Sequence, residues 1–384
     1  MRDERRGKME CPRLSELNMF FKLSKTDSKT KARLGVIHTP HGDIESPFFM
    51  PVGTRATVRT LSSEDLHTIG ASIELSNAYH LYIRPGLDVI ENAGGLHKFM
   101  NWNKPILTDS GGYQVFSLTK LRKITDEGVK FQSHFDGKQH LFTPEEVMHI
   151  QKVFGSDMVM PLDECAPYPC EREPAQLALE RTTAWARRSK EHFYKTGMHE
   201  RGQRLFGIVQ GSTYQDLRER SIRELLEIGF DGYAIGGVSV GEPVKDMFET
   251  LDWVMPLMPE NAPRYFMGIG MPDQIVKAVG MGIDMFDTVL PTRFGRYGTA
   301  FTSRGRVNIH NGEFIKDLSP VDDACVASLA VTIRAVISAI YLMLMRSLAC
   351  ACWRIITFIF ILSSWGVSVR PSPGIVTKNF KKIF

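Results

Sequence analysis

A short stretch near residue 290 combines one acid with two arginines. Asp287 lies in an apolar run, and Arg293 and Arg296 follow it in what we expect to be a loop. A carboxylate at the end of a buried strand can act as a nucleophile or carry a proton, and arginines bind phosphate groups well. The stretch therefore indicates an enzyme that acts on a polyanion. Taken alone, it is equally well explained by an aspartate that caps a turn beside solvated arginines.

Polar or glycine-rich residues follow five other apolar runs. They are Asp109 with Ser110, Gly111 and Gly112; Asp163; Gln210; Gly236 with Gly237; and Gly268 with Ile269 and Gly270. A single polar segment of this kind is more often a turn than a functional site. Five of them, together with the acid near residue 290, indicate that the ends of the strands form one site.

The chemistry of these residues favours a flat, guanine-like base as the ligand. Asp163 can accept two parallel hydrogen bonds from adjacent N–H groups, while Gln210 and the backbone N–H of Gly237 can donate to a neighbouring carbonyl oxygen. Tyr113 and Met267 are candidates for the two faces of the ring. The methionine alone is better explained by packing inside the barrel, so its assignment depends on the rest of the set.

Eight apolar runs, each bounded by turn signals, predict the strands that position these residues. The expected strands are 48–52, 72–75, 105–108, 157–162, 205–209, 232–235, 264–267 and 284–289. Helices are expected between them, over 214–228, over 272–281, and after Thr143, an N-cap followed by a proline. This alternation favours an α/β fold of the (β/α)8 TIM-barrel type over an open doubly wound sheet. In such a barrel, the groups that do chemistry lie at the C-terminal ends of the strands.

Composition describes a globular protein with one large domain and an appendage, or with two domains. The chain has 384 residues, of which 43% are apolar and 23% charged. A net charge of +4 is too small to indicate nucleic-acid binding by itself, so any basic footprint must be local. Six irregularly spaced cysteines do not form a disulfide framework, which favours a cytoplasmic location. Residues 1–19 lack the apolar core of a signal peptide and are expected to be a loose extension, with Met9 and Met19 as alternative starts.

Six motifs, in order along the chain, resemble the bacterial queuine tRNA-ribosyltransferases, the tRNA-guanine transglycosylase family. They are DSGGYQVFSL, DECAPYP, GIVQG, GGVSVGE, MGIGMPD and DMFDTVLPTR. The resemblance implies a TIM-barrel domain over 20–323 that exchanges guanine at wobble position 34 of tRNAs with a GUN anticodon (Asp, Asn, His and Tyr) for preQ1, in queuosine biosynthesis. It also implies tRNA and preQ1 or guanine as partners, a homodimer, and Zn(2+) as a structural metal.

The resemblance assigns roles to individual residues. Asp287 is expected to be the nucleophile that forms a covalent intermediate with the ribose, and Asp109 the general acid and base. The expected base pocket contains Asp109, Ser110, Gly111, Gly112, Tyr113, Asp163, Gln210, Gly236, Gly237 and Met267. The expected RNA-binding residues are Gly268, Ile269, Gly270, Met271, Pro272, Asp273, Gln274, Thr292, Arg293, Phe294, Gly295 and Arg296. Glu242 is expected to brace the loop at Gly237.

The sequence departs from the family where the zinc site is expected. The family has a C-x-C-x-x-C pattern followed by a histidine; counted from Cys325, the other three positions hold Ala327, Ala330 and Ile356. One cysteine cannot form a structural zinc site, which needs four ligands, so we predict no metal ligands here. The family's homodimer uses the region near this site and is therefore in doubt for this chain.

Residues 324–384 form an apolar tail in place of the zinc subdomain and final helix of the family. Its uncharged stretches, 335–345 and 355–369, are shorter than a membrane span. We interpret the tail as the product of a reading-frame shift, because permissible codons read two bases on can restore the cysteines and the histidine at the expected spacing. A genuine membrane tail is the alternative, and the DNA around codon 326 distinguishes the two.

Three interpretations of function follow. The first is an active transglycosylase. The second is a product whose active-site residues are all encoded but which is unstable, weakly active or inactive because its C-terminus is altered. The third is a non-catalytic tRNA-binding partner subunit, against which Asp287 and Asp109 argue, since such a subunit is expected to lack the nucleophile.

Overall fold

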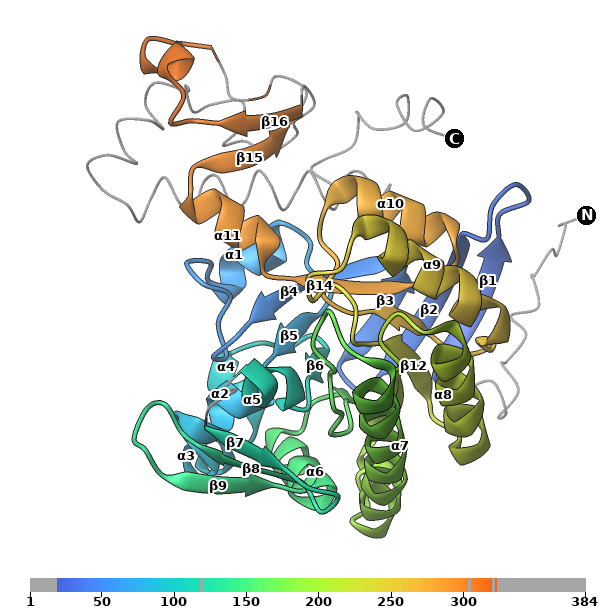
Figure 1. Ribbon diagram of the computed structural model, residues 1–384. Helices are drawn as coiled ribbons and strands as arrows, with labels where there is room; N and C mark the ends of the chain where they lie inside the picture. Colours follow the sequence, from blue (N-terminus) through green and yellow to red (C-terminus); the bar gives the residue numbers. More distant parts are fainter. Residues whose placement is uncertain (1–18, 118–120, 303–304, 320–321, 323–384) are drawn as a thin grey trace, which may run out of the picture.

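The computed structural model describes residues 19–117, 121–302, 305–319 and 322. Its centre is a closed barrel of eight parallel strands (Figure 1). In barrel order they are β4 (Phe48–Gly53), β5 (Glu74–Ser76), β6 (Ile106–Thr108), β10 (Met158–Val159), β11 (Arg204–Val209), β12 (Gly232–Ile235), β13 (Arg264–Phe266) and β14 (Met285–Thr288). Pairing of β14 with β4 closes the barrel. Each expected strand overlaps one observed strand, so the predicted (β/α)8 barrel is confirmed.

The barrel interior is a packed core. Apolar side chains from the strands fill it, because parallel strands covered by helices are buried on both faces. Those that form the inner cluster include Phe48, Met50, Leu75, Leu107, Met158, Phe206, Ile208, Ala234, Tyr265 and Met285. This packing leaves room for a ligand only beyond the ends of the strands.

Helices surround the barrel. They are α1 (Ser63–Thr68), α2 (Ala78–Ile83), α3 (Leu87–Asn92), α4 (Leu96–Met100), α5 (Gly112–Ser117), α6 (Pro144–Phe154), α7 (Arg172–Lys195), α8 (Gln215–Ile228), α9 (Val244–Val254), α10 (Pro272–Gly280) and α11 (Leu290–Arg296), with short 3-10 turns η1 (His199–Arg201), η2 (Met255–Leu257) and η3 (Gly312–Ile315). The three expected helices are confirmed as α6, α8 and α10. Thr143 caps α6 as predicted, because its Oγ1 accepts the N–H of Glu146.

One local prediction is wrong. Arg293 and Arg296 were expected in a loop, but both belong to α11. The helix forms because Pro291, whose fixed φ suits a first helical turn, follows the strand almost at once. The buried side of α11, which includes Thr292, then packs onto the protein.

Three small sheets outside the barrel were not predicted. They are β1 (Phe21–Thr26) with β2 (Arg33–Thr39) and β3 (Gly42–Ser46); β7 (Arg122–Ile124) with β8 (Val129–Gln132) and β9 (Gln139–Phe142); and the hairpin β15 (Thr299–Thr302) with β16 (Gly305–Asn308). The first sheet is tied to the base of the barrel by a buried ion pair, in which the Arg33 guanidinium donates to both carboxylate oxygens of Asp284. The hairpin lies beyond α11 (Figure 1).

The expected N-terminal extension, the zinc positions and the apolar tail lie outside the described residues. Within the part of the chain that the structure describes, no helix is both long and apolar enough to cross a membrane.

Candidate active site

A cavity of about 390 Å³ lies at the C-terminal ends of the barrel strands. Both predicted catalytic acids line it, as do most of the predicted pocket residues. The predicted residues in its wall are Asp109, Ser110, Gly112, Tyr113, Asp163, Gly236, Gly237, Met267, Gly268, Asp287 and Arg293. Two further pocket residues, Gly111 and Gln210, lie behind the wall and hydrogen-bond Asp109 and Asp163 respectively.

Asp287 projects from β14 with one carboxylate oxygen engaged. Its Oδ1 accepts a 2.7 Å hydrogen bond from the Tyr265 hydroxyl and a 2.8 Å hydrogen bond from the N–H of Gly268. Burial raises the pKa of Asp287, and these two hydrogen bonds oppose that effect. Burial and the nearby acid raise the pKa of Tyr265 well above its ordinary value, so the phenol remains a donor. Oδ2 has no hydrogen-bond donor among the described residues and is available to a ligand.

Asp109 is held just beyond β6 by four hydrogen bonds. Oδ1 accepts from the backbone N–H groups of Ala78 (2.7 Å) and Gly111 (3.2 Å), and Oδ2 accepts from the side-chain amides of Asn77 (2.5 Å) and Gln114 (2.9 Å). Burial raises its pKa in spite of these donors. The sequence analysis missed both amides. The first could have been found as the residue directly after β5, and the second lies inside the DSGGYQ motif.

Asp163 lies at the bottom of the cavity between two donors. Ser110 Oγ donates to Oδ1 at 3.1 Å, and Gln210 Nε2 donates to Oδ2 at 2.8 Å. Burial, with a smaller contribution from the charge of Asp109, raises the pKa of Asp163 to about 6. At neutral pH the group is therefore an ionised acceptor that protonates readily.

The loop after β12 approaches Gln210 closely. Gly237 has φ +61°, and a Cβ at this position would lie 2.2 Å from Oε1 of Gln210. Glu242 braces the same loop, because its carboxylate accepts the backbone N–H groups of Ser239 and Val240. The expected bracing role of this glutamate is consistent with these contacts.

A buried arginine that the sequence analysis missed holds two strand ends together. The Arg218 guanidinium donates to the carbonyl oxygens of Ser212, Val209, Gly236 and Gly237. Burial lowers its pKa to about 10, so it remains a cation at neutral pH. Its position on the apolar face of α8 was the available signal, since an arginine there must find partners inside the protein.

The predicted RNA-binding residues lie at the rim of the cavity. The segment 268–274 links β13 to the start of α10, and 292–296 belongs to α11. Arg293 is exposed and Tyr113 is 59% exposed, so both can reach a ligand outside the barrel. The side chains of Ile269 and Thr292 are buried, so any RNA contact at these two positions would come from the backbone.

The closed barrel and the acids gathered at its strand ends define a TIM-barrel enzyme. A family model described as queuine tRNA-ribosyltransferase matches residues 27–343, and the chain belongs to this family of tRNA pentosyltransferases. Similar proteins named queuine tRNA-ribosyltransferase occur in Desulforamulus reducens, which is 56% identical over 305 residues (79% of this chain and 81% of the relative), and in Pelotomaculum thermopropionicum, which is 57% identical over the same shares. A third, in Desulforudis audaxviator, is 54% identical over 309 residues. The homologues support a tRNA-guanine transglycosylase, and the family suggests a structural metal.

Proposed function

We propose that this chain exchanges guanine at wobble position 34 of tRNAs with a GUN anticodon (those for Asp, Asn, His and Tyr) for preQ1, in queuosine biosynthesis. The observation that carries the proposal is that Asp287, Asp109 and Asp163 line one cavity, and each is held by its own donors. A single acid would suit many reactions. Three acids with different surroundings can divide nucleophilic attack, proton transfer and base recognition among themselves.

Asp287 is the proposed nucleophile. The donors from Tyr265 and Gly268 both engage Oδ1, which leaves Oδ2 to attack C1′ of the ribose. As the bond from C1′ to the guanine breaks, oxocarbenium character develops, and the carboxylate traps it as a covalent ester. One difficult displacement is thereby divided into two, and guanine leaves before preQ1 enters the same pocket.

Asp109 is the proposed proton carrier. Burial raises its pKa, which suits a group that must gain and lose a proton, and once protonated it can donate to the departing guanine. In the second half of the reaction, the ionised carboxylate accepts a proton from the incoming preQ1 as that base attacks C1′ and releases the nucleophile. Protons therefore balance over the two halves, and the amides of Asn77 and Gln114 keep the carboxyl in place throughout.

Asp163 is the proposed reader of the base. Its ionised carboxylate is proposed to accept the N1–H and the 2-amino group of guanine. The carbonyl oxygen of the base is proposed to accept the remaining side-chain N–H of Gln210 and the backbone N–H of Gly237. Tyr113 and Met267, which line the cavity, are proposed to cover the two faces of the ring. A pocket of this depth requires the target nucleotide to be flipped out of the anticodon loop.

The rim of the cavity is the proposed RNA-binding surface. Arg293 and Arg296, with the segment 268–274, are proposed to hold the phosphates that flank the flipped nucleotide. Arginine suits this task because its planar guanidinium can bind two phosphate oxygens at once. These contacts would set the position of the RNA and leave recognition to the base pocket.

The C-terminus qualifies the proposal. At the expected spacing only Cys325 remains of the zinc ligands, so the donor set does not fit the Zn(2+) site of the family. We therefore propose that the homodimer is weakened and that the exchange activity is reduced. We also propose a cytoplasmic location. The second candidate function is that of a non-catalytic tRNA-binding subunit. It would be favoured only if the chain exchanges no guanine into tRNA.

Exchange of radiolabelled guanine into tRNA-Tyr tests the proposal. The native chain is expected to incorporate label, and the Asp287→Ala variant is expected to incorporate none. Incorporation by both proteins would refute the assignment of the nucleophile. Failure of both, with tRNA binding retained, would favour the non-catalytic subunit or the inactive product.

A further inference from the structure

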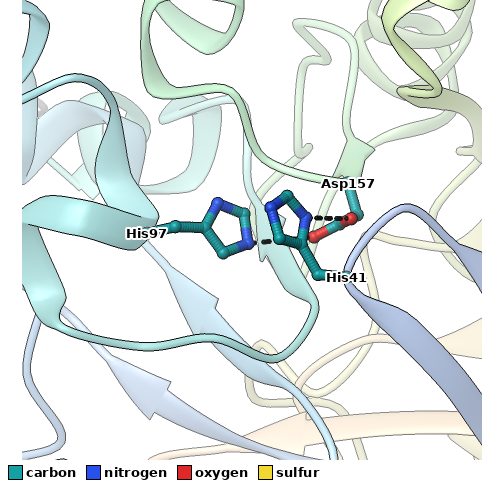
Figure 2. A group of neighbouring side chains, drawn as sticks. All are labelled: His41, His97 and Asp157. Atoms are coloured by element: carbon teal, nitrogen blue, oxygen red, sulfur yellow. Dashed lines mark hydrogen bonds and ion pairs between the residues drawn. The ribbon is translucent and has the colours of Figure 1, made fainter.

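Two histidines and one aspartate form a cluster (Figure 2), which lies at the opposite end of the barrel from the candidate active site. His41 is in the turn between β2 and β3, His97 is in α4, and Asp157 directly precedes β10. Within the described residues, one potential ligand atom from each lies within 4.8 Å of the other two. Because Asp163 follows the far end of the same strand, the cluster is at the N-terminal face, where TIM barrels gain stability and do not perform chemistry.

The aspartate of this cluster carries a buried charge. Nδ1 of His41 lies 2.7 Å from Oδ1 of Asp157, and Nε2 of His97 lies 3.2 Å from Oδ2. Burial raises the pKa of Asp157, but its interactions with the two histidines and the N–H of Ile106 outweigh this and hold the pKa below its ordinary value. The fully buried carboxylate is therefore ionised, and the two histidines and the N–H of Ile106 are its partners.

The two imidazoles lie directly against each other. Their rings stack with centroids 3.5 Å apart and planes 16° apart. A neutral imidazole offers one nitrogen lone pair to a metal ion. Nε2 of His97 is also buried, and it forms no well-aligned hydrogen bond with any described group. An ionised carboxylate beside imidazole nitrogen is the donor chemistry of zinc and its neighbours.

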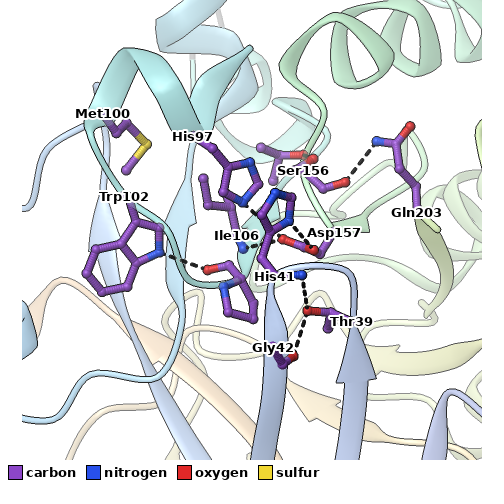
Figure 3. Close-up of polar contacts among 12 residues, drawn as sticks. Thr39, His41, Gly42, His97, Met100, Trp102, Ile106, Ser156, Asp157 and Gln203 are labelled. Carbon is purple, nitrogen blue, oxygen red and sulfur yellow. Dashed lines mark hydrogen bonds and ion pairs between the residues drawn. The ribbon is translucent and has the colours of Figure 1, made fainter. Parts of the chain in front are cut away.

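The potential ligands are held in place by their surroundings (Figure 3). The hydroxyl of Thr39 accepts the N–H of His41 at 3.2 Å and donates to the carbonyl of Gly42 at 2.8 Å, which fixes the turn. The N–H of Ile106 donates to Oδ2 of Asp157 at 2.8 Å. Outer contacts of this kind orient metal ligands in known sites.

The potential ligand atoms are already close together. Two ligand atoms at about 2.1 Å from a tetrahedral ion are about 3.4 Å apart, and the nitrogen-to-carboxylate separations of 2.7 and 3.2 Å are near this value. The imidazole rings must leave their stacked arrangement so that both nitrogen lone pairs point at one ion. A cavity of about 620 Å³, lined by His41 and His97 and also by Glu64 and His67, lies against the cluster. It provides an entry path and room for a water molecule as the fourth ligand.

We propose that His41, His97 and Asp157 bind a divalent transition-metal ion of the zinc class. The ion ties the N-terminal sheet to α4 and to the base of β10, three segments that are distant in sequence. It would bind the buried carboxylate of Asp157 together with the two histidines, and its role is structural. Base exchange does not depend on the ion, so a result against this metal site would leave the proposed function unaffected.

Cobalt titration of the full chain, stripped with a chelator, tests this site. We expect one Co²⁺ per chain, with visible d–d bands and no thiolate-to-cobalt charge-transfer band, and displacement by Zn²⁺. His97→Gln keeps a polar side chain of similar reach and is expected to weaken binding by at least roughly tenfold. His67→Gln, in the same cavity but outside the cluster, is the matched control and is expected to bind as the native chain does. Thermal unfolding should shift upward with Zn²⁺ in the native chain and the control, but not in H97Q.

Three results would overturn the site: no cobalt binding by the native chain, a thiolate band that assigns the ion to cysteines, or equal binding by H97Q. If circular dichroism finds H97Q unfolded, His41→Gln in the half-exposed turn replaces it, and the same outcomes apply.

Discussion

Gln210 donates a 2.8 Å hydrogen bond to Oδ2 of Asp163, while its own Oε1 is buried without a hydrogen-bond partner among the described residues. The amide nitrogen therefore orients the acid, and the amide oxygen faces the loop that carries Gly237. A ligand that enters the cavity meets a carboxylate held in place by this amide. This suits the edge of a purine better than a phosphate, which would face the negative charge of the acid.

The titration of Asp163 predicts how base binding depends on pH. Only the ionised carboxylate accepts both N–H groups of guanine, and its pKa is about 6. Guanine affinity should be full above this value and fall about tenfold for each pH unit below it. Calorimetric titration with guanine on either side of about pH 6 checks this. Asp163→Asn should bind weakly at every pH, and a pH-independent affinity in the native chain would contradict the assignment.

The titration of Asp163 also predicts that the free energy of unfolding changes with pH in the opposite direction to guanine affinity. Because the folded pKa of Asp163 exceeds its ordinary value of 3.8, the folded state binds more protons between the two values. This group's contribution to the free energy of unfolding therefore increases as pH falls from about 6 towards about 4. Comparison of urea unfolding of the native chain and Asp163→Asn isolates it. The variant should lack this slope, and equal slopes in the two proteins would argue against the raised pKa.

Tyr265 is predicted to tune the nucleophile without contacting the base. In Tyr265→Phe, Asp287 loses one of its two donors to Oδ1, and its pKa should rise further. We expect kcat to fall about tenfold, which corresponds to about 1.4 kcal/mol, with KM for guanine little changed. The acid limb of the kcat profile should move to higher pH. A loss that appears only in KM would assign the phenol to substrate binding instead.

Gly237 is predicted to require the absence of a side chain. In Gly237→Ala, the added methyl would collide with Oε1 of Gln210, and the positive φ would be strained. We expect KM for the base to rise at least about tenfold, since the amide must move away from Asp163. Gly280→Ala, at the end of α10 with open space around the added methyl, is the matched control and should leave exchange unchanged. Equal kinetics for the two variants would show that the amide is not part of the base pocket.

The sequence predicted the barrel because its strands have a strong signal. Each is a short apolar run with a turn after it, and burial on both faces makes such runs conspicuous. The β1–β3 sheet gave no comparable signal. Buried positions alternate along β2, but two of them hold Arg33 and Gly35, which are not apolar side chains. The strand is held by the distant acid Asp284, a contact that spacing along the chain does not reveal.

The sequence predicted the site residues that directly follow strands. It did not predict residues that contact them from a neighbouring strand. Asp109, Asp163 and Asp287 could be identified by position, because the ends of parallel strands converge at one face. Tyr265 was missed, since a tyrosine inside a buried strand is expected to be core. Its hydroxyl finds Asp287 only because β13 and β14 are neighbours in the barrel. Roles of this kind depend on pairing between strands and not on local sequence.

Arg218 gives a prediction about stability with a control on the same helix. Its guanidinium donates to four backbone carbonyls inside the protein, so Arg218→Met would remove this donor from all four. The carbonyl of Val209 would keep the N–H of Gly236 as a donor. We expect a loss of at least about 3 kcal/mol in the free energy of unfolding. Arg220→Met removes ion pairs to Glu180 and Glu224 that are largely exposed, and it should cost no more than about 0.5 kcal/mol. Urea unfolding of the two variants measures the difference, and because both replace an arginine by methionine on α8, helix propensity cancels. Similar losses in the two would mean that the carbonyls find water when the guanidinium is removed, and that the strand ends beside the base pocket are held by packing alone.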